Sequence, residues 1–234
     1  MYNDKKISVV IPCYNEEAGL HEIFPAMPDF VDEVIIIDNG CSDNSIKIAN
    51  GRGARVIFEK RKGYGFAIKA GLVEAKGDII VIIDADNSYP VRDIEKLLGY
   101  MLSQQKDFVI GCRYPLIYKG SQSVIHIIAN YFITLFISFL FHINLKDSQS
   151  GMVVFKKEVI NMLQVKNNDM GFSQEFKIRV LSEPALNYGE MHIAFLLRKG
   201  QAKFNRAKDS FLNLWALFPL WLEFRMSSRK RRIP

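Results

Sequence analysis

Apolar and polar positions alternate along the first half of the chain in blocks that predict strands followed by helices. Short runs rich in Val, Ile and Phe predict strands at Ile7–Ile11, Val34–Ile37, Val56–Phe58, Ile79–Ile83 and Phe108–Ile110. Segments of helical character lie between them, at Glu17–Met27, Ser45–Gly51, Gly65–Ala75 and Val91–Ser103. Apolar strands that alternate with helices predict an α/β fold, in which a mostly parallel sheet is covered by helices on both faces.

Polar and acidic residues follow four of these predicted strands. They occupy the stretches Pro12–Glu17, Asp38–Asp43, Asp84–Pro90 and Gly111–Arg113. In a parallel sheet, ligands bind outside the carboxyl ends of the strands. One such turn on its own is most simply a loop with a helix cap, but four of them at one edge favour a ligand site.

The second half of the chain carries a long apolar segment. Residues 124–143 are apolar except for a polar side chain at every fourth position, namely His126, Asn130, Thr134, Ser138 and His142. The length suits a membrane span. The polar stripe instead favours a helix that lies on or partly in a membrane, or that packs on the domain. A span would also place the acidic residues before it and Asp147 after it on opposite sides of the membrane.

Residues Phe211–Phe224 predict a second amphipathic helix, which is rich in aromatic residues and includes Trp215 and Trp221. A basic tail follows it, and aromatics beside Lys and Arg are typical of an anchor at a membrane surface. We therefore expect two parts. One is an α/β domain at residues 1–208 that includes the apolar helix 124–143, and the other is an amphipathic helix with a basic tail at residues 209–234.

Composition and charge narrow the classes of partner. Hydrophobic residues make up 49% of the 234 residues and charged residues 24%, which excludes a disordered chain. The net charge of +6 comes largely from basic blocks at residues 198–208 and 225–234, and these favour a nucleotide, a nucleic acid or an anionic lipid. The three cysteines lack metal-ligand spacing, so we expect reduced thiols in a cytosolic protein. The charged N-terminus predicts no signal peptide.

The residues at the predicted sheet edge suit a divalent cation and a diphosphate. Asp84 and Asp86 end a buried strand one residue apart, and such hard oxygen ligands select Mg²⁺ or Mn²⁺. The four histidines are not paired at ligand spacing, which argues against zinc. A departing diphosphate also needs preorganised cations, for which Arg113, Arg198 and Lys203 are the candidates.

Several segments occur in an order that resembles one known family. They read SVVIPCYNEE, IIIDNGCSDNS, IIVIIDADNSYP, GCRY, DSQSGMVVFKKE and GFSQEFKIRV. Together they are similar to the inverting glycosyltransferases of family 2, which have the GT-A fold, and most similar to the dolichyl- and polyprenyl-phosphate sugar synthases. The resemblance extends over residues 8–208, and the ordered set is specific although each segment alone is not.

The resemblance implies roles for the residues of the donor site. Those expected to bind the nucleotide are Pro12, Tyr14, Glu16, Asp38, Lys62, Gly65, Asp84 and Ala85. Pro12, Tyr14 and Glu16 would border the base and ribose, and Asp38 would contact the base. Asn39 stands where many relatives have a second Asp. The glycine-containing loop with Lys62 and Gly65 opens a predicted helix, and we expect it to close over the donor.

The resemblance also implies a catalytic and metal-binding set. Asp84 and Asp86 would form the DXD-like pair, with Asp86 the surer metal ligand, and Ser88 replaces a Gln found in some relatives. Arg113 would meet phosphate as part of the catalytic set. Asp147 would lie at the acceptor side, where it positions a lipid phosphate or acts as general base toward a hydroxyl. Glu175 is expected either on the surface or in the site.

The expected activity is inverting transfer of a hexose from a UDP- or GDP-sugar to a polyprenyl or dolichyl phosphate, at the cytoplasmic face of a membrane. The protein would be peripheral or monotopic. One alternative is a peripheral transferase whose acceptor is a glycan or another hydroxyl. A sugar nucleotidyltransferase should have a Gly-rich basic turn where this chain has PCYNEE. A nucleic-acid-binding module would explain the basic tail, but acidic strand ends would repel its phosphates, so no nucleic acid partner is expected.

Overall fold

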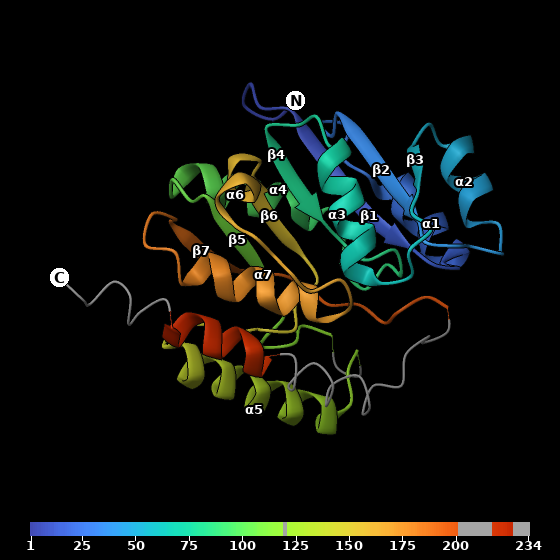
Figure 1. Ribbon diagram of the computed structural model, residues 1–234. Helices are drawn as coiled ribbons and strands as arrows, with labels where there is room; N and C mark the ends of the chain where they lie inside the picture. The colour runs from blue at the N-terminus through green and yellow to red at the C-terminus, as the bar shows by residue number, and fades with distance from the viewer. Residues whose placement is uncertain (119–120, 201–216, 227–234) are drawn as a thin grey trace.

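The computed structural model describes residues 1–118, 121–200 and 217–226. Within these ranges it shows a seven-stranded sheet with the strand order β3-β2-β1-β4-β6-β5-β7 (Figure 1). The strands are β1 (Ile7–Cys13), β2 (Glu33–Asp38), β3 (Arg55–Phe58), β4 (Ile79–Ile82), β5 (Phe108–Cys112), β6 (Val153–Lys156) and β7 (Tyr188–His192). The helices are α1 (Glu17–Ile23), the 3-10 turn η1 (Phe24–Ala26), α2 (Ser45–Gly51), α3 (Tyr64–Glu74), α4 (Asp93–Ser103), α5 (Val124–Phe141), α6 (Glu158–Met162) and α7 (Gly171–Leu181).

The sheet is mostly parallel, as the sequence predicts. β1 pairs in parallel with β2 and β4, and β2 does so with β3. β6 is the exception, because it runs antiparallel between β4 and β5. β7 then pairs in parallel with β5 at the edge. The predicted strands include neither β6 nor β7. The apolar run at residues 153–155 of β6 is of the same kind as the run that predicts β3, so β6 is a strand that the sequence analysis missed, whereas β7, with the sequence YGEMH, has few apolar residues.

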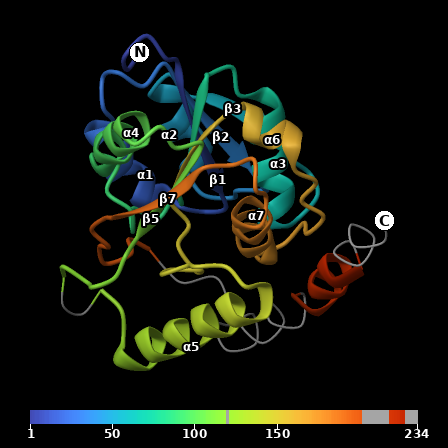
Figure 2. The ribbon, with the colours of Figure 1, turned by 90° about the vertical axis from the view of Figure 1, so that its left-hand side faces the viewer.

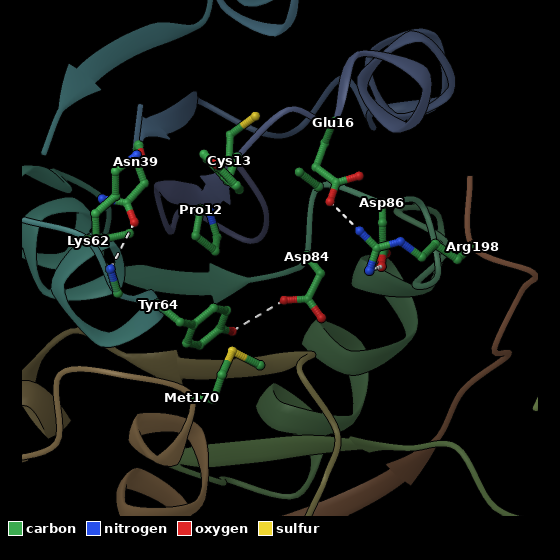
Figure 3. Close-up of a pocket in the computed structure, with 14 residues that line it drawn as sticks. Pro12, Cys13, Glu16, Asn39, Lys62, Tyr64, Asp84, Asp86, Met170 and Arg198 are labelled. Carbon is green, nitrogen blue, oxygen red and sulfur yellow. Dashed lines mark hydrogen bonds and ion pairs between the residues drawn. The ribbon is translucent and has the colours of Figure 1, made fainter. Parts of the chain in front are cut away.

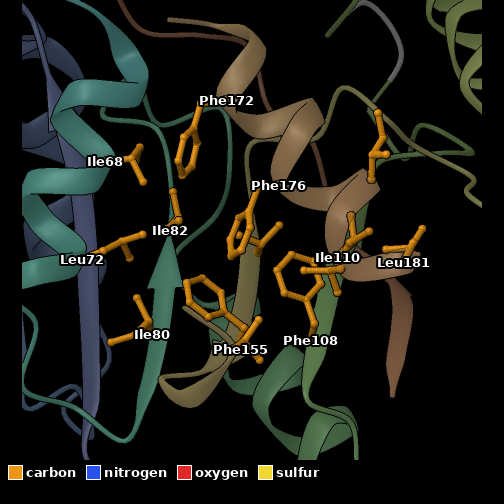
Figure 4. Packing of buried hydrophobic residues seen from close by; sticks show 14 of the residues in the cluster. Ile68, Leu72, Ile80, Ile82, Phe108, Ile110, Phe155, Phe172, Phe176 and Leu181 are labelled. Atoms are coloured by element: carbon orange, nitrogen blue, oxygen red, sulfur yellow. The ribbon is translucent and has the colours of Figure 1, made fainter. Parts of the chain in front are cut away.

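Helices cover both faces of the sheet because successive strand residues point to opposite sides. On one face, a buried cluster that includes Val9 and Ile11 packs against α1 and α4. On the other, a cluster that includes Val10 and Ile82 packs against α3 and α7. Figure 2 shows these helix pairs on opposite sides of the sheet, and Figure 4 shows Phe155 of β6 among the side chains of the second cluster. The core thus fixes the strand ends that carry the polar turns.

Helix α5 presents its polar stripe to the domain and its apolar face outward. It begins after Ser123, whose Oγ accepts from the His126 N–H, and it ends at His142 in the left-handed region with φ 54°. Asn130 donates to the Tyr114 hydroxyl over 2.8 Å, and the Thr134 hydroxyl lies 2.8 Å from that of Ser148. The exposed apolar side chains are Val124, Ile125, Ile128, Tyr131, Phe132, Leu135, Phe136 and Phe139.

Residues 217–226 are helical and lie beside the C-terminal end of α5 (Figure 1). The Phe224 ring meets the Phe141 ring edge-on at 5.7 Å, and Glu223 pairs with Arg179 of α7. The start of the predicted helix 211–224 and the tail 227–234 lie outside the described residues. Within the described part of the chain, Val124–Phe141 is the single helix long and apolar enough to cross a membrane, and 17% of it is buried.

Candidate functional site

A cavity of about 360 Å³ opens at the carboxyl ends of β1, β2 and β4, the edge at which the sequence predicts a ligand. This volume is in the range of small-molecule sites. Most of the predicted donor-site residues line it, namely Pro12, Tyr14, Glu16, Lys62, Asp84, Ala85, Asp86 and Arg198. Of the other lining residues, Gly63 and Tyr64 belong to the loop that the sequence expects to close over the donor. The sequence did not predict that Cys13, Asn39, Ala67 and Met170 bind the nucleotide.

The acidic pair sits on the turn that follows β4. The Asp84 carboxylate accepts from the Tyr64 hydroxyl over 3.3 Å, and Figure 3 shows both side chains at the cavity. Burial, and after it the charge of Asp86, raises the pKa of Asp84 to about 7. Asp86 is buried, and its carboxylate accepts from the Ser88 N–H over 2.9 Å. Two carboxylates whose charges interact in this way favour a bound cation.

Two glycines let the backbone approach this acidic turn. A Cβ on Gly151 would lie 2.5 Å from the Asp84 carboxylate, and one on Gly19 of α1 would lie 2.0 Å from the Ala85 carbonyl oxygen. Both distances are shorter than atoms tolerate, so any larger residue would displace the turn that presents Asp84 and Asp86. The acidic pair is therefore positioned by segments far from it in sequence.

Arg198 neutralises part of the acidic charge. Its guanidinium lies 3.1 Å from the Asp86 carboxylate and forms a second ion pair with Glu16 (Figure 3). The backbone N–H of Lys199 also donates to the Asp86 carbonyl over 2.9 Å. Arg198 Nε is buried without a hydrogen-bond partner among the described residues. The arginine thus lies beside the acidic pair with one donor that an anion could satisfy. Lys203, its predicted companion, lies outside the described residues.

The loop after β3 forms the opposite wall. The Lys62 ammonium lies 4.8 Å above the Tyr14 ring and donates to the Asn39 carbonyl over 3.1 Å. The Asn39 amide donates to the carbonyls of Glu59 and Arg61, over 2.9 and 2.8 Å, and its oxygen accepts from the Gly63 N–H. The position at which many relatives carry an Asp therefore fastens this loop to the end of β2.

Two residues predicted to bind the nucleotide do not line the cavity. The Asp38 carboxylate accepts from the N–H groups of Gly40 and Cys41, over 2.9 and 2.7 Å, which shapes the turn after β2. Gly65 is buried against Asn168, to whose backbone a Cβ would approach within 2.6 Å. In this structure both residues shape the walls of the cavity.

Arg113 and Asp147 are also absent from the lining. They form a buried bidentate pair, with both nitrogen–oxygen distances at 2.7 Å, and the Arg113 N–H adds a third bond to Asp147. Arg113 is 5% exposed and Asp147 0%. The guanidinium lies 5.0 Å from the Phe195 ring. The charge of Arg113 lowers the pKa of Asp147 against the effect of burial. Of the two roles that the sequence leaves open for Asp147, this burial argues against that of general base toward a hydroxyl acceptor.

A buried lysine lies beneath that pair. The Lys177 ammonium of α7 donates to the Ser150 carbonyl and, over 3.0 Å, to the Ser173 hydroxyl. Burial lowers its pKa to about 7. Glu175, expected either on the surface or in the site, is buried and accepts from the backbone N–H groups of Lys166 and Asn167. Neither residue lines the cavity.

The residues at the cavity fit a divalent cation of the Mg²⁺ or Mn²⁺ class. No cluster of three or more His, Cys, Asp or Glu side chains that could hold a metal is found in the described residues. Mg²⁺ is commonly held by one or two carboxylates together with water and substrate phosphates. Asp84 and Asp86 supply such a pair, and burial together with the charge of Asp86 raises the pKa of Asp84, both of which a bound cation would offset.

Comparison with known proteins identifies the family. The profile of glycosyl transferase family 2 matches residues 8–163. The chain belongs to this family. A relative in Haloferax volcanii named dolichyl-phosphate hexose transferase is 29% identical over 210 residues, 86% of this chain and 88% of the relative. The Haloferax volcanii low-salt glycan biosynthesis hexosyltransferase is 30% identical and covers 88% of this chain.

The chain spans about half the length of several curated relatives, including that hexosyltransferase, of which 51% is matched. Among solved structures, glucosyl-3-phosphoglycerate synthase from Mycobacterium tuberculosis has a TM-score of 0.70 at 22% identity, over 91% of this chain and 78% of its own. That structure contains Mn²⁺, uridine diphosphate and phosphoglyceric acid. At this identity the likeness establishes the GT-A fold. The chain therefore combines membership of glycosyl transferase family 2 with that fold.

Proposed function

We propose that this glycosyltransferase moves a hexose from a UDP- or GDP-sugar to a polyprenyl or dolichyl phosphate at the cytoplasmic face of a membrane. The observation that supports this most is the pairing of two features. Asp84, Asp86 and Arg198 gather at one cavity, and the nearby helix α5 turns its apolar face outward. The first suits a nucleotide diphosphate and a cation, and the second suits a lipid surface.

Donor binding uses the two walls of the cavity. Tyr14 and Lys62 would border the base and ribose, since the ammonium already lies over the ring. Asp84 and Asp86 would hold Mg²⁺ or Mn²⁺, which when bound supplies charge that stabilises the leaving diphosphate. Arg198 would move from Asp86 to the diphosphate, because phosphate satisfies its unpaired Nε and a cation replaces it at the carboxylate.

The transfer step is an in-line displacement. An oxygen of the acceptor phosphate attacks the anomeric carbon, the bond from that carbon to the diphosphate oxygen breaks, and the nucleoside diphosphate leaves with the electron pair. The configuration inverts. A lipid phosphate is already ionised near neutral pH and needs no general base, which agrees with a sealed Asp147. The buried pair of Arg113 and Asp147 would then position the segment that carries Ser150, against which Lys177 is packed.

The membrane assignment rests on the orientation of α5. Its polar side chains are satisfied by the domain, so the outward aromatic and aliphatic side chains gain most by burial in lipid. Each would contribute on the order of 1–3 kcal/mol when buried, so that a few suffice for peripheral attachment. The basic residues of the C-terminal tail would favour the anionic cytoplasmic leaflet. The relative named dolichyl-phosphate hexose transferase supports the same acceptor class.

The activity can be tested by donor screening. The purified chain is incubated with MnCl₂, polyprenyl phosphate in vesicles and a panel of UDP- and GDP-hexoses, and lipid products are analysed by mass. We expect one donor to give a hexosyl polyprenyl phosphate. Transfer to a soluble glycan alone would favour the hydroxyl-acceptor alternative, and no transfer from any donor would contradict the proposal.

Membrane attachment has its own test. Phe132 and Phe136 on the outward face of α5 are replaced together by Asn, and Phe58, which is 68% exposed on the edge strand β3, is replaced by Asn as a matched control. Sedimentation with anionic vesicles should fall for the α5 variant and stay unchanged for the control. Equal binding by all three proteins would overturn the assignment of α5 as the lipid-facing helix.

A further inference from the structure

Two of the three cysteines lie together, and one of them, Cys13, lines the cavity. The sulfur atoms of Cys13, at the end of β1, and Cys41, in the turn after β2, are 3.7 Å apart. Both thiols are free, and β1 and β2 are neighbours whose register pairs Cys13 with Asp38. The pairing of β1 with β2 thus brings the turn that carries Cys41 next to Cys13.

The surroundings of the two thiols differ in a way that suits stepwise oxidation. Cys13 is 1% exposed, whereas Cys41 is half-buried. The backbone N–H of Asn15 donates to the Cys41 sulfur over 3.3 Å. The Cys13 thiol, and then this N–H, lower the pKa of Cys41 against burial. Hydrogen bonding to Cys41 and burial raise the pKa of Cys13. Cys41 is thus the more accessible and more reactive of the two.

We propose that Cys13 and Cys41 form a redox-sensitive modification site that closes to an intramolecular disulfide when a peroxide reacts with Cys41. In the first step the Cys41 sulfur attacks hydrogen peroxide, giving the sulfenic acid and one water. The Cys13 sulfur then attacks the sulfenic acid, giving the disulfide and a second water. Two electrons pass from the thiol pair to the peroxide. A dithiol reductant later supplies two electrons that reduce the disulfide to the two thiols.

The disulfide would act on the donor site. The sulfur atoms must approach from 3.7 Å to about 2.05 Å, which draws the turn after β2 toward β1. That turn touches Lys62, because a Cβ on Gly40 would lie 2.4 Å from the Lys62 ammonium. Cys13 directly precedes Tyr14, above which Lys62 lies. Closing the disulfide therefore displaces the wall that we assign to the base and ribose, an effect that rests on the proposed function.

Formation of the disulfide is tested by mass spectrometry of peptides from the oxidised full chain. After titration with hydrogen peroxide we expect a peptide pair linking Cys13 to Cys41, with Cys112 left as a thiol that reacts with maleimide once the oxidised chain is denatured. Burial raises the pKa of Cys112 to about 11, so it serves as an internal control. Cys41→Ser should abolish the linkage, Cys112→Ser should leave it intact, and Cys13→Ser should leave a sulfenic acid that dimedone traps. Linkage through Cys112, linkage between two chains, or persistence of all three thiols would overturn the proposal.

The effect on the donor site is measured separately. Binding of UDP and of GDP with MnCl₂ is compared for reduced protein, oxidised protein and oxidised protein treated with dithiothreitol. We expect affinity to fall at least about fivefold on oxidation and to recover on reduction. Cys41→Ser should show no such loss under peroxide. An unchanged affinity in disulfide-linked protein would overturn the coupling. Failure of reduced protein to bind either nucleotide would overturn the donor-site assignment. In that case the mass test would still decide whether the disulfide between Cys13 and Cys41 forms.

Discussion

The acidic pair of Asp84 and Asp86 and the buried pair of Arg113 and Asp147 differ in one physical respect, their access to the cavity. The first pair lines the cavity and is only partly neutralised, by Arg198. The second is sealed, and both oxygens of Asp147 are occupied by Arg113. Acidic side chains in the two pairs thus have different surroundings. An incompletely compensated charge at a cavity suits a ligand, whereas a compensated charge in the interior holds loops in place.

Asp147→Asn tests the sealed pair and should have the largest effect on folding. It leaves the buried guanidinium of Arg113 without its counter-charge, and breaking such a pair typically destabilises by about 3–5 kcal/mol. The free energy of unfolding is measured in urea. Glu22→Gln is the control, because the Glu22–Lys199 pair is about half exposed on both sides and should contribute under about 1 kcal/mol. Full stability of Asp147→Asn together with lost transfer would restore the general-base role.

Asp86→Ala tests the pair that lines the cavity, Asp84 and Asp86. In contrast to Asp147→Asn, it should affect activity more than stability. We expect transfer to fall by roughly 10²–10³-fold, because the diphosphate loses preorganised charge stabilisation, while the fold persists. Turnover and thermal melting are measured with and without MnCl₂. Excess EDTA should abolish transfer by the wild type. If the variant keeps wild-type turnover, or the wild type keeps it in excess EDTA, the pair that lines the cavity is not a cation site.

Arg198→Ala should have a smaller effect on turnover than Asp86→Ala. A charge-assisted hydrogen bond to phosphate is worth about 1.5–3 kcal/mol, or roughly 10- to 150-fold in rate. Lys199→Ala is the matched control on the same segment, since its ammonium lies near Glu22 and away from the cavity. Equal losses in kcat/KM for the two variants would mean that the segment contributes net charge and not a specific contact.

Asp84→Asn tests how the stability of the acidic pair depends on pH. We expect it to change the free energy of unfolding less than Asp147→Asn does. The pKa of Asp84 is raised from 3.8 to about 7, so in the absence of metal the folded state binds its proton more tightly than the unfolded state. Stability from this group is therefore present at low pH and is lost as pH rises between these two values. The Asn variant escapes that loss.

Because part of the Asp84 side chain remains exposed to solvent, screening reduces the effect, and we expect the free energy of unfolding of the variant to exceed that of the wild type by about 1–2 kcal/mol at pH 8. The two proteins should converge near pH 4. Urea unfolding in EDTA at several pH values measures the difference, and added Mn²⁺ should stabilise the wild type alone. If the difference in unfolding free energy between the two proteins does not change with pH, the proton that couples to stability is not bound by Asp84.

The sequence by itself determined the alternating strands and helices of the first half, and the gathering of Glu16, Asp84 and Asp86 at one edge. These features follow from local periodicity and from the rule that parallel strands end at the same edge. It also indicated the family through the order of its motifs. The polar stripe of residues 124–143 was visible as well, because helical spacing is a property of neighbouring residues.

Only the tertiary structure decided how those groups are used. Met170 reaches the cavity from a segment far from β1 in sequence, Arg113 seals Asp147, and Ser148 and Tyr114 turn the polar stripe of α5 inward. The placement of β6, antiparallel between β4 and β5, was likewise decided by the tertiary structure. Each of these outcomes depends on which distant residues approach one another and on the water they exclude, and a pattern of neighbours along the chain carries no record of either.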